Sequence, residues 1–264
     1  MAVLTLERDG VALAVEDWGS GPALVFAHGL TGTRRQVWRL LEPLSDKFRV
    51  ITFDQRGHGD SHPVRGPAVF DPGEMASDIV AVLDALGVRQ AVVGGTSMGA
   101  ATALLCALRH PERVTRLVLT APAFSDVPNP GRRSLEEIGE EIARSGLAAQ
   151  VARLRQHDWT AAGMTEEAMD FRSAMLLSHD AESVATACMA VANWVVLPDL
   201  APLTALAMPT LIVAWEGDAV HPWELAQRLA TALPRSQLAR AALPLYHNEV
   251  GFLARFVRPF LAAA

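Results

Sequence analysis

The chain has 264 residues, half of them apolar and 20% charged, which is enough to bury one large core without a second domain. Its 23 basic and 29 acidic side chains give a formal net charge of −6, so there is no basic surface for a nucleic-acid backbone. No apolar run reaches the ~18 residues of a membrane span, and the N-terminus lacks the pattern of a secretory signal. Together with only two widely spaced cysteines, Cys106 and Cys188, these features indicate a cytoplasmic protein.

Short apolar runs with strand character alternate with longer runs of helical spacing through the first half of the chain. Parallel strands need crossover connections, and helices supply them, so this alternation predicts the α/β class. Glycine and proline occur at the connections between these runs, as is typical of turns and loops. We expect strands over residues 11–15, 23–27, 49–53, 91–93 and 116–120 and helices over residues 34–44, 74–86 and 98–109.

After residue 121 the pattern changes, because no strand-like run follows until residues 210–214, while helix starts occur near Ser134 and Asp180. This stretch predicts a helical insertion. The alternation then resumes with a strand over 210–214, a helix over 222–233, a weaker strand over 237–243 and a final helix over 248–261. We therefore expect a core built from residues 1–122 and 201–264, and a helical cap built from residues 123–200.

The segment Gly95-Thr96-Ser97-Met98-Gly99 joins an expected strand to an expected helix. It fits the G-x-S-x-G pattern of a nucleophile elbow, in which a sharp turn holds a serine in a strained backbone conformation. The flanking glycines allow the strand and the helix to approach closely. Pattern and context together indicate Ser97 as a nucleophile.

A serine hydroxyl needs a base to take its proton and a carboxylate to hold that base, so Ser97 implies a catalytic triad. In this architecture the acid and then the base follow the serine along the chain, on loops after later strands. Asp218 comes just after the expected strand 210–214 and is the expected acid. Glu216 beside it is expected to face solvent, and Asp126 is the alternative acid.

Chain order leaves only two of the eight histidines as candidate bases. His247 lies between the last expected strand and the last expected helix, where a base should project, and we expect it to be the base. His221 comes only three residues after Asp218 and adjoins Pro222. We interpret His221 as a helix-entry residue that lines the rim of the substrate pocket.

Attack by Ser97 on a carbonyl group creates a negative oxygen that fixed backbone N–H groups must stabilise. The amide of Met98, directly after the nucleophile, is one expected donor. The amide of Leu30, in the glycine-containing loop after the strand 23–27, is the other. His28 opens that loop and is expected to lie beside the substrate.

The glycine-rich segment 54–61 lacks the helix start of a phosphate-binding loop, and its carboxylates would repel a phosphate. We interpret it as a structural turn and leave open whether its side chains brace the oxyanion loop. His58 and His62 are four residues apart, but the neighbouring glycines and proline disfavour a helix, and no third ligand is evident. We therefore expect no metal and no cofactor.

Together, these motifs resemble the α/β-hydrolase superfamily over nearly the whole chain apart from the helical insertion. The matching segments are His28-Gly29 with the oxyanion turn, residues 54–61 with the D-x-R-G-x-G-x-S turn, residues 95–99 with the elbow, and residues 110–114 with the exit from the elbow helix. The resemblance implies Ser97 as nucleophile, Asp218 as acid and His247 as base, with Leu30 and Met98 supplying the oxyanion amides.

Differences from the family pattern narrow the expected activity. Haloalkane dehalogenases and epoxide hydrolases of the superfamily carry aspartate at the elbow, where this chain has Ser97. Carbon–carbon bond hydrolases usually have a longer glycine-rich run after His28 than this chain does. The remaining matches resemble serine carboxylesterases, lactonases and small lipases.

The insertion leaves the sheet at the carboxyl edge of the strands, where ligands bind in such folds, so we expect it to select the substrate. Trp159 and Trp194 are its candidate substrate contacts. The leading hypothesis is a cofactor-independent serine hydrolase acting on a small, mainly apolar ester or lactone. The alternatives are a lyase, thioesterase, carbon–carbon hydrolase or biosynthetic tailoring enzyme using the same site, or a non-enzymatic ligand sensor. The oligomeric state stays open, with a homodimer among the options.

Overall fold

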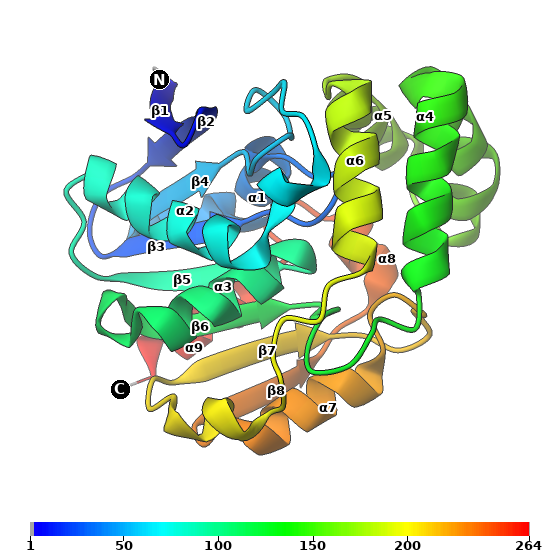
Figure 1. Ribbon diagram of the computed structural model, residues 1–264. Coiled ribbons are helices and arrows are strands. Elements are labelled where there is room, and N and C mark those ends of the chain that lie inside the picture. Colours follow the sequence, from blue (N-terminus) through cyan, green and yellow to red (C-terminus); the bar gives the residue numbers. More distant parts are fainter. Residues whose placement is uncertain (1–2, 264) are drawn as a thin grey trace.

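The computed structural model describes residues 3–263 of the chain and is drawn in Figure 1. Its strands are β1 (Leu4–Arg8), β2 (Val11–Trp18), β3 (Ala23–Ala27), β4 (Arg49–Phe53), β5 (Ala91–Thr96), β6 (Val114–Thr120), β7 (Thr210–Ala214) and β8 (Ser236–Arg240). They form one sheet in the order β1-β2-β4-β3-β5-β6-β7-β8. The strands from β3 to β8 run parallel, whereas β1 and β2 pair antiparallel at one edge.

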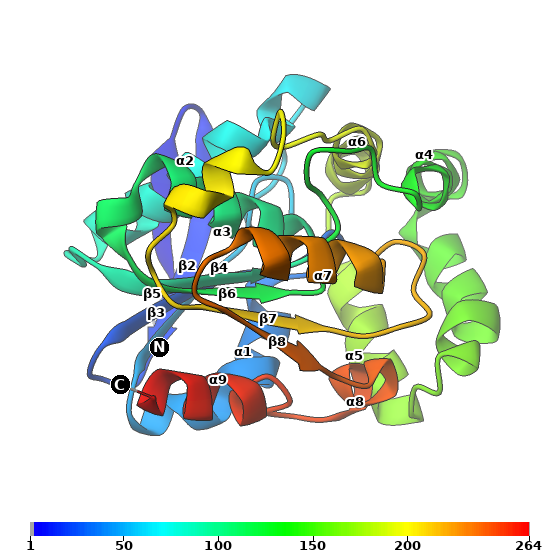
Figure 2. The same cartoon turned by 90° about the horizontal axis from the view of Figure 1, so that it is seen from below.

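Helices cover both faces of this sheet, so the expected α/β class is confirmed. Those within residues 3–263 are α1 (Arg34–Leu41), α2 (Pro72–Ala85), α3 (Met98–Arg109), α4 (Arg132–Leu154), α5 (Glu166–Leu177), α6 (Ala181–Ala192), α7 (Trp223–Ala232), α8 (Leu243–Asn248) and α9 (Ala254–Ala262). Figure 2 shows α1 and α9 on one face of the sheet and α2, α3 and α7 on the other. None of the described helices is both long and apolar enough to cross a membrane.

The central strands are buried on both sides. Every residue of β5 and β7 is buried, and in β3 only Ala23 is partly exposed. A parallel strand that helices cover on both faces needs apolar side chains in both directions, so it reads as a continuous apolar run. This is why the expected strands 23–27 and 210–214 coincide with β3 and β7.

The antiparallel hairpin at the edge is larger than the sequence analysis predicts. The expected strand 11–15 extends to Trp18 in β2, and β1 was not predicted. Asp9 and Gly10 join the two strands with φ values of 52° and 78°, as a two-residue hairpin turn requires. The Asp-Gly pair is therefore the signal in the sequence for this hairpin.

Two expected helices have different boundaries in the structure. The helix expected over 34–44 is shorter, since α1 gives way to a 3-10 turn containing Pro43, which has no N–H to donate. The single helix expected over 248–261 is wrong. The chain instead forms α8 and α9, and Gly251 between them adopts a φ of 73° that interrupts the helix.

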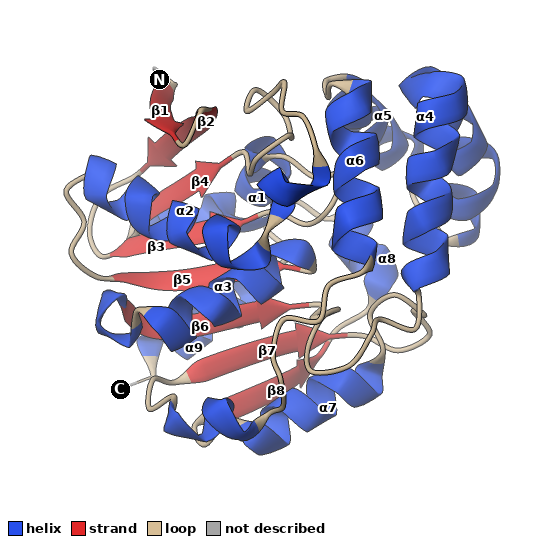
Figure 3. Cartoon of the chain, in the orientation of Figure 1, coloured by secondary structure: helices blue, strands red, loops and turns tan. Residues whose placement is uncertain are grey.

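Between β6 and β7 the described chain forms α4, α5 and α6 and no strand. These inserted helices lie beyond the ends of the strands toward which the arrows point (Figures 1 and 3). Side-chain hydrogen bonds connect them to the rest of the molecule. Ser183 Oγ accepts from the Val64 amide and donates to the Val64 carbonyl, both at 3.1 Å. Asn248 Oδ1 accepts from the Thr165 amide at 2.9 Å, and its Nδ2 donates to the Gly163 carbonyl at 2.9 Å.

A group of buried histidines also connects the inserted helices to the core. The His58 ring lies between His28 and His179, with centroid distances of 5.0 and 5.4 Å. His179, just after α5, accepts from the Gly59 amide at 2.9 Å and donates to the Thr31 carbonyl at 3.1 Å. Burial lowers the pKa of His28 and of His179 to about 4, so these rings are neutral at pH 7.

Acid should therefore destabilise the protein before its carboxylates titrate. The folded-state pKa of His179, about 4, lies below the ordinary histidine value of 6.5, so the unfolded state takes up the proton first. Stability is then fully present above pH 6.5 and is lost as the pH falls toward 4. The variant His179→Gln keeps one donor and one acceptor but cannot titrate. Urea unfolding at pH 7 and pH 5 should show the wild type losing up to ~2 kcal/mol more than this variant. Equal losses would contradict the account.

Candidate active site

The turn between β5 and α3 holds Ser97 in a conformation that side chains rarely adopt. β5 ends at Thr96 and α3 begins at Met98, so Ser97 makes the turn alone, with φ 54° and ψ −111°. Its amide donates to the Thr120 carbonyl of β6 at 2.9 Å. A backbone conformation of this kind costs ~1–3 kcal/mol and persists only where its surroundings impose it.

Two glycines create those surroundings. A Cβ atom at Gly95 would collide with the Gly99 carbonyl, and a Cβ at Gly99 would collide with the Ala27 carbonyl at the end of β3. The start of α3 therefore rests directly on the backbone of β3 and β5. This close approach fixes the direction in which the Ser97 side chain leaves the sheet.

Asp218 and His221 come from one turn between β7 and α7. His221 Nε2 lies 2.9 Å from Ser97 Oγ, and His221 Nδ1 lies 2.7 Å from Asp218 Oδ2. A carboxylate accepts hydrogen bonds only, so we assign the proton to Nδ1. Nε2 is then free to accept the proton of the Ser97 hydroxyl. The three side chains form one continuous chain of hydrogen bonds.

Asp218 is held as a carboxylate by several donors. It accepts from Trp215 Nε1 at 3.0 Å and from the Val220 and His221 amides at 2.9 and 3.2 Å. Burial by itself raises the pKa of Asp218, but the hydrogen bonds and charge of His221 and the bonds from Trp215 and Val220 outweigh it, leaving the pKa well below its usual value. Asp218 is therefore ionised at any pH near neutral.

The expectation for His247 is corrected by this geometry, because the hydrogen bond to Ser97 comes from His221. His247 lies at the end of α8, and its Nδ1 accepts from Arg172 Nη1 of α5 at 3.3 Å. Burial and the Arg172 charge lower the pKa of His247 to about 3, so it is neutral at pH 7. His221, expected only at the pocket rim, lies between Ser97 and Asp218 instead.

The three hydrogen-bonded side chains open into a cavity of about 140 Å³. Leu30, an expected oxyanion donor, lines this cavity together with Gly29, Arg172, Trp215, Tyr246 and His247. Met98, the other expected donor, follows Ser97 directly and is fully buried. The cavity is thus bounded by the loop after β3, the elbow, the turn after β7, and helices α5 and α8.

Of the residues expected to touch substrate, His28 and Trp194 lie in the core, and Trp159 lines a second cavity that shares Arg172 with the one at Ser97. His28 is fully buried and bonded by backbone, donating to the Gly29 carbonyl and accepting from the Gln55 amide, each at 2.8 Å. Trp194 donates to the Phe70 carbonyl at 3.1 Å within the core.

Two further expectations concern other polar groups. Asp126, the alternative acid, forms a two-pronged ion pair with Arg228 at 2.9 and 2.8 Å and is thereby held on the side of α7. Within residues 3–263, no three or more His, Cys, Asp or Glu side chains are grouped so that they could hold a metal ion.

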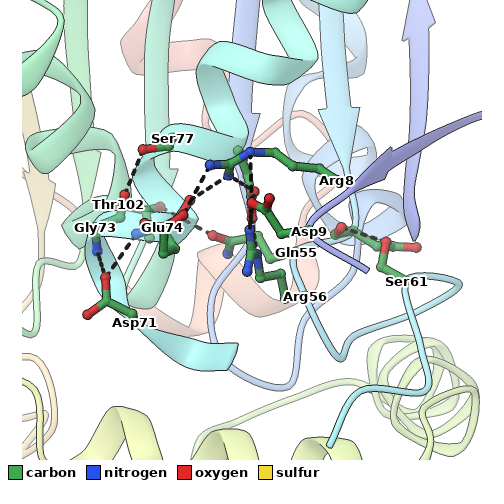
Figure 4. Close-up of polar contacts among 12 residues, drawn as sticks. Arg8, Asp9, Gln55, Arg56, Ser61, Asp71, Gly73, Glu74, Ser77 and Thr102 are labelled. Atoms are coloured by element: carbon green, nitrogen blue, oxygen red, sulfur yellow. Dashed lines mark hydrogen bonds and ion pairs between the residues drawn. The ribbon is translucent and has the colours of Figure 1, made fainter. Parts of the chain in front are cut away.

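The turn 54–61 braces the loop that carries Leu30. Gln55 Nε2 donates to the His28 carbonyl at 2.6 Å, and Thr102 of α3 donates to Gln55 Oε1 at 3.2 Å. Figure 4 shows Gln55 and Thr102 in this contact, with Arg56 close by. These bonds tie the loop after β3 to the elbow helix, so the bracing role that the sequence left open is observed.

Comparisons with known proteins agree with this architecture. A family model described as "alpha/beta hydrolase fold" matches residues 22–243. The 3-oxoadipate enol-lactonase 2 of Acinetobacter baylyi is 30% identical over 224 residues, covering 82% of this chain and 79% of that protein. A putative carbamate hydrolase of Stutzerimonas stutzeri is 28% identical, covering 83% of this chain and 82% of that protein.

Solved structures extend the likeness to the whole chain. A thermophilic esterase from Thermogutta terrifontis superposes with a TM-score of 0.77 at 27% identity, covering 99% of this chain and 96% of that one. The enol-lactonase from Burkholderia xenovorans superposes with a TM-score of 0.81 at 20% identity, covering 98% and 100%. At that identity the second likeness shows the fold alone.

The close approach at the elbow predicts a steep cost for one added methyl group. Gly95→Ala should destabilise the protein by ~1–3 kcal/mol, because the new Cβ would collide with the Gly99 carbonyl and the start of α3 would have to move away from β5. Gly29→Ala is the matched control, since its Cβ would approach the Thr96 carbonyl only to 3.3 Å. Urea unfolding of both variants measures the difference. Equal stabilities would show that the elbow is not packed as described.

Proposed function

The chain belongs to the α/β-hydrolase fold family, and we propose that it is a cofactor-independent serine hydrolase that cleaves a carboxylic ester or a lactone. One observation carries the proposal. The His221 imidazole bonds the Ser97 hydroxyl on one side and the ionised Asp218 on the other, at 2.9 and 2.7 Å. This is the arrangement that makes a serine nucleophilic at neutral pH.

In the proposed reaction, Ser97 Oγ attacks the carbonyl carbon while its proton moves to His221 Nε2. The imidazolium is stabilised by Asp218, and it then protonates the leaving alkoxide as the acyl-oxygen bond breaks. This step leaves the acyl group as an ester on Ser97 and releases a free alcohol. When the substrate is a lactone, the new hydroxyl group stays attached to the acyl group. Water then attacks the acyl-enzyme while its proton moves to His221 Nε2. The imidazolium returns this proton to Ser97 Oγ as the acyl-oxygen bond breaks, and the carboxylic acid is released.

The developing oxyanion needs donors on the side of the carbonyl opposite the base. We assign this role to the amides of Met98 and Leu30, the first fixed by the start of α3 and the second by the braced loop after β3. The bonds from Gln55 and Thr102 support this assignment, because a donor stabilises the oxyanion well only when it is held in place beforehand.

The inserted helices act in this proposal as a cap that selects the substrate. Arg172 of α5 lines the cavity at Ser97, which supports the role. The enol-lactonase and the esterase among the similar proteins favour esters or lactones as the substrate class. The two cysteines are buried and free, which is consistent with work in a reducing, cytoplasmic compartment.

A fluorophosphonate probe tests which histidine activates Ser97. The wild type should label at Ser97, and Ser97→Ala should not label at all. His221→Asn should label at least ~100-fold more slowly than the wild type, as expected when a general base is removed. His247→Asn should label much faster than His221→Asn, because His247 bonds Arg172 and not the serine. The reverse ranking of the two variants would return the role of base to His247.

Steady-state kinetics test whether Asp218 is the acid of the triad. Asp218→Asn should lower kcat for an aryl ester by ~10⁴, because an amide at this position disfavours the tautomer that His221 needs. Asp126→Asn removes the other candidate carboxylate and should keep its activity, since that group pairs only with Arg228 at the surface. Similar losses in both variants would refute the assignment of Asp218.

A further inference from the structure

Arg172 is a cation without a counterion at the wall of the cavity that contains Ser97. It projects from α5, and within residues 3–263 it forms no ion pair with an Asp or Glu side chain. Its polar contacts are the hydrogen bond to His247 Nδ1 at 3.3 Å and the face of Trp159, whose centroid lies 5.9 Å from Cζ. Its Nε atom is shielded from solvent and makes no hydrogen bond.

Arg172 also lines a second cavity, and Gln150 in its wall is a second hydrogen-bond donor without an acceptor. This space measures about 130 Å³ and is lined by Arg172, Gln150, Trp159, Met175, Leu176 and Ile138. Gln150 is fully buried, and its Oε1 accepts from Arg153 Nε at 3.4 Å. Because an arginine only donates, Gln150 Nε2 is fixed as the remaining donor, and it too lacks an acceptor.

Buried donors in this condition are costly. A buried polar group without a hydrogen-bond partner lowers the stability of the fold, and a charged group lowers it more. Burial also lowers the pKa of Arg172, although a guanidinium stays protonated at neutral pH. Nearby Tyr246 and His247 do not offset the charge, because burial raises the pKa of Tyr246 and lowers that of His247 to about 3, so both are neutral at pH 7. A ligand that brings an anionic group into this space would offset the charge of Arg172 and would offer Gln150 an acceptor.

We propose that Arg172 and Gln150 form a carboxylate-binding site, so that the substrate is an ester or lactone that carries a second, free carboxylate. Guanidinium and amide N–H groups match the oxygens of a carboxylate in number and geometry. The apolar walls from Trp159, Met175 and Leu176 then cover the methylene groups next to it.

Arg172 lines both cavities, so it defines how such a substrate lies. The scissile carbonyl occupies the cavity at Ser97, and the carboxylate lies against Arg172 and reaches toward Gln150. At ~30 Å³ for each water of liquid volume, each space holds the equivalent of four or five waters, which suits a short acyl chain. Neutral His247 accepts from Nη1 and thereby orients the guanidinium without competing for its charge. His247 is a positioning residue in this account.

The inference rests on the proposed hydrolase function, and a pair of esters separates the two. The probe is 4-nitrophenyl hydrogen glutarate, and its neutral counterpart is 4-nitrophenyl 5-methylhexanoate, in which an isopropyl group replaces the carboxylate. The wild type should have the higher kcat/KM for the anionic ester. Arg172→Met should lower the ratio of kcat/KM for the anionic over the neutral ester roughly 10- to 100-fold, the value of a charged hydrogen bond. Gln150→Leu should lower it by a smaller factor.

Arg144→Met is the matched control, because it removes one arginine from the same inserted helices at an exposed position paired with Glu141. Its ratio should equal that of the wild type. If Arg172→Met leaves the ratio unchanged while both esters are hydrolysed, the carboxylate site is wrong and the hydrolase stands. A fall that Arg144→Met reproduces also overturns the site, because it would reflect net charge alone.

Binding without turnover gives an independent readout. Monomethyl glutarate, which carries one free carboxylate, should bind Ser97→Ala protein in calorimetry more tightly than the neutral methyl 5-methylhexanoate does, and the preference should disappear in the Ser97→Ala/Arg172→Met double variant. If neither ester is hydrolysed by the wild type, the proposed function fails, yet this titration still tests the site. If Arg172→Met does not fold, Gln150→Leu and competition by glutarate against the neutral ester in the wild type replace it. Equal binding of monomethyl glutarate and methyl 5-methylhexanoate would overturn the inference.

Discussion

The hydrogen bond between His221 and Asp218 lies within a single turn, and the rest of the candidate site depends on it. Asp218 Oδ1 accepts from the amides of Val220 and His221, so the backbone wraps around the carboxylate and delivers the imidazole, three residues on, to Oδ2. Acid and base are thus fixed relative to each other by local geometry. Only one distance, from this turn to Ser97, has to be set by the fold.

The sheet sets that distance. β6 lies between the strands that end at the elbow and at the acid turn, and its last residues bond to both sides. The Ser97 amide donates to the Thr120 carbonyl at 2.9 Å, and the Ala121 amide donates to the Val213 carbonyl at 2.7 Å. The glycines at positions 95 and 99 fix the elbow against β3. A strained serine and a rigid turn are therefore connected through backbone hydrogen bonds, which deform less readily than side-chain packing.

The elements that the sequence predicts well are those with a local physical cause. Buried parallel strands appear in the sequence as continuous apolar runs. The elbow at Ser97 is recognisable by its flanking glycines, which are needed because the strand and the helix approach closely there. Chain order leaves both His221 and His247 as candidate bases, and His247 is preferred in the sequence because it follows the last expected strand. That preference is wrong because it ignores the turn chemistry after Asp218, which places His221 beside the carboxylate. The local signal was present, since an aspartate that caps the next amides places the side chain of the third residue beside itself. No sequence pattern marks Arg172 as a binding residue. That it has no acidic partner becomes visible only in the tertiary structure.

The most direct measurement is a crystal structure of the protein phosphonylated on Ser97. We predict that His221 Nε2 lies within hydrogen-bond distance of the modified Oγ, with Nδ1 still donating to Asp218 and His247 still bonded to Arg172. A structure in which His221 points away and the His247 imidazole contacts the adduct would contradict it.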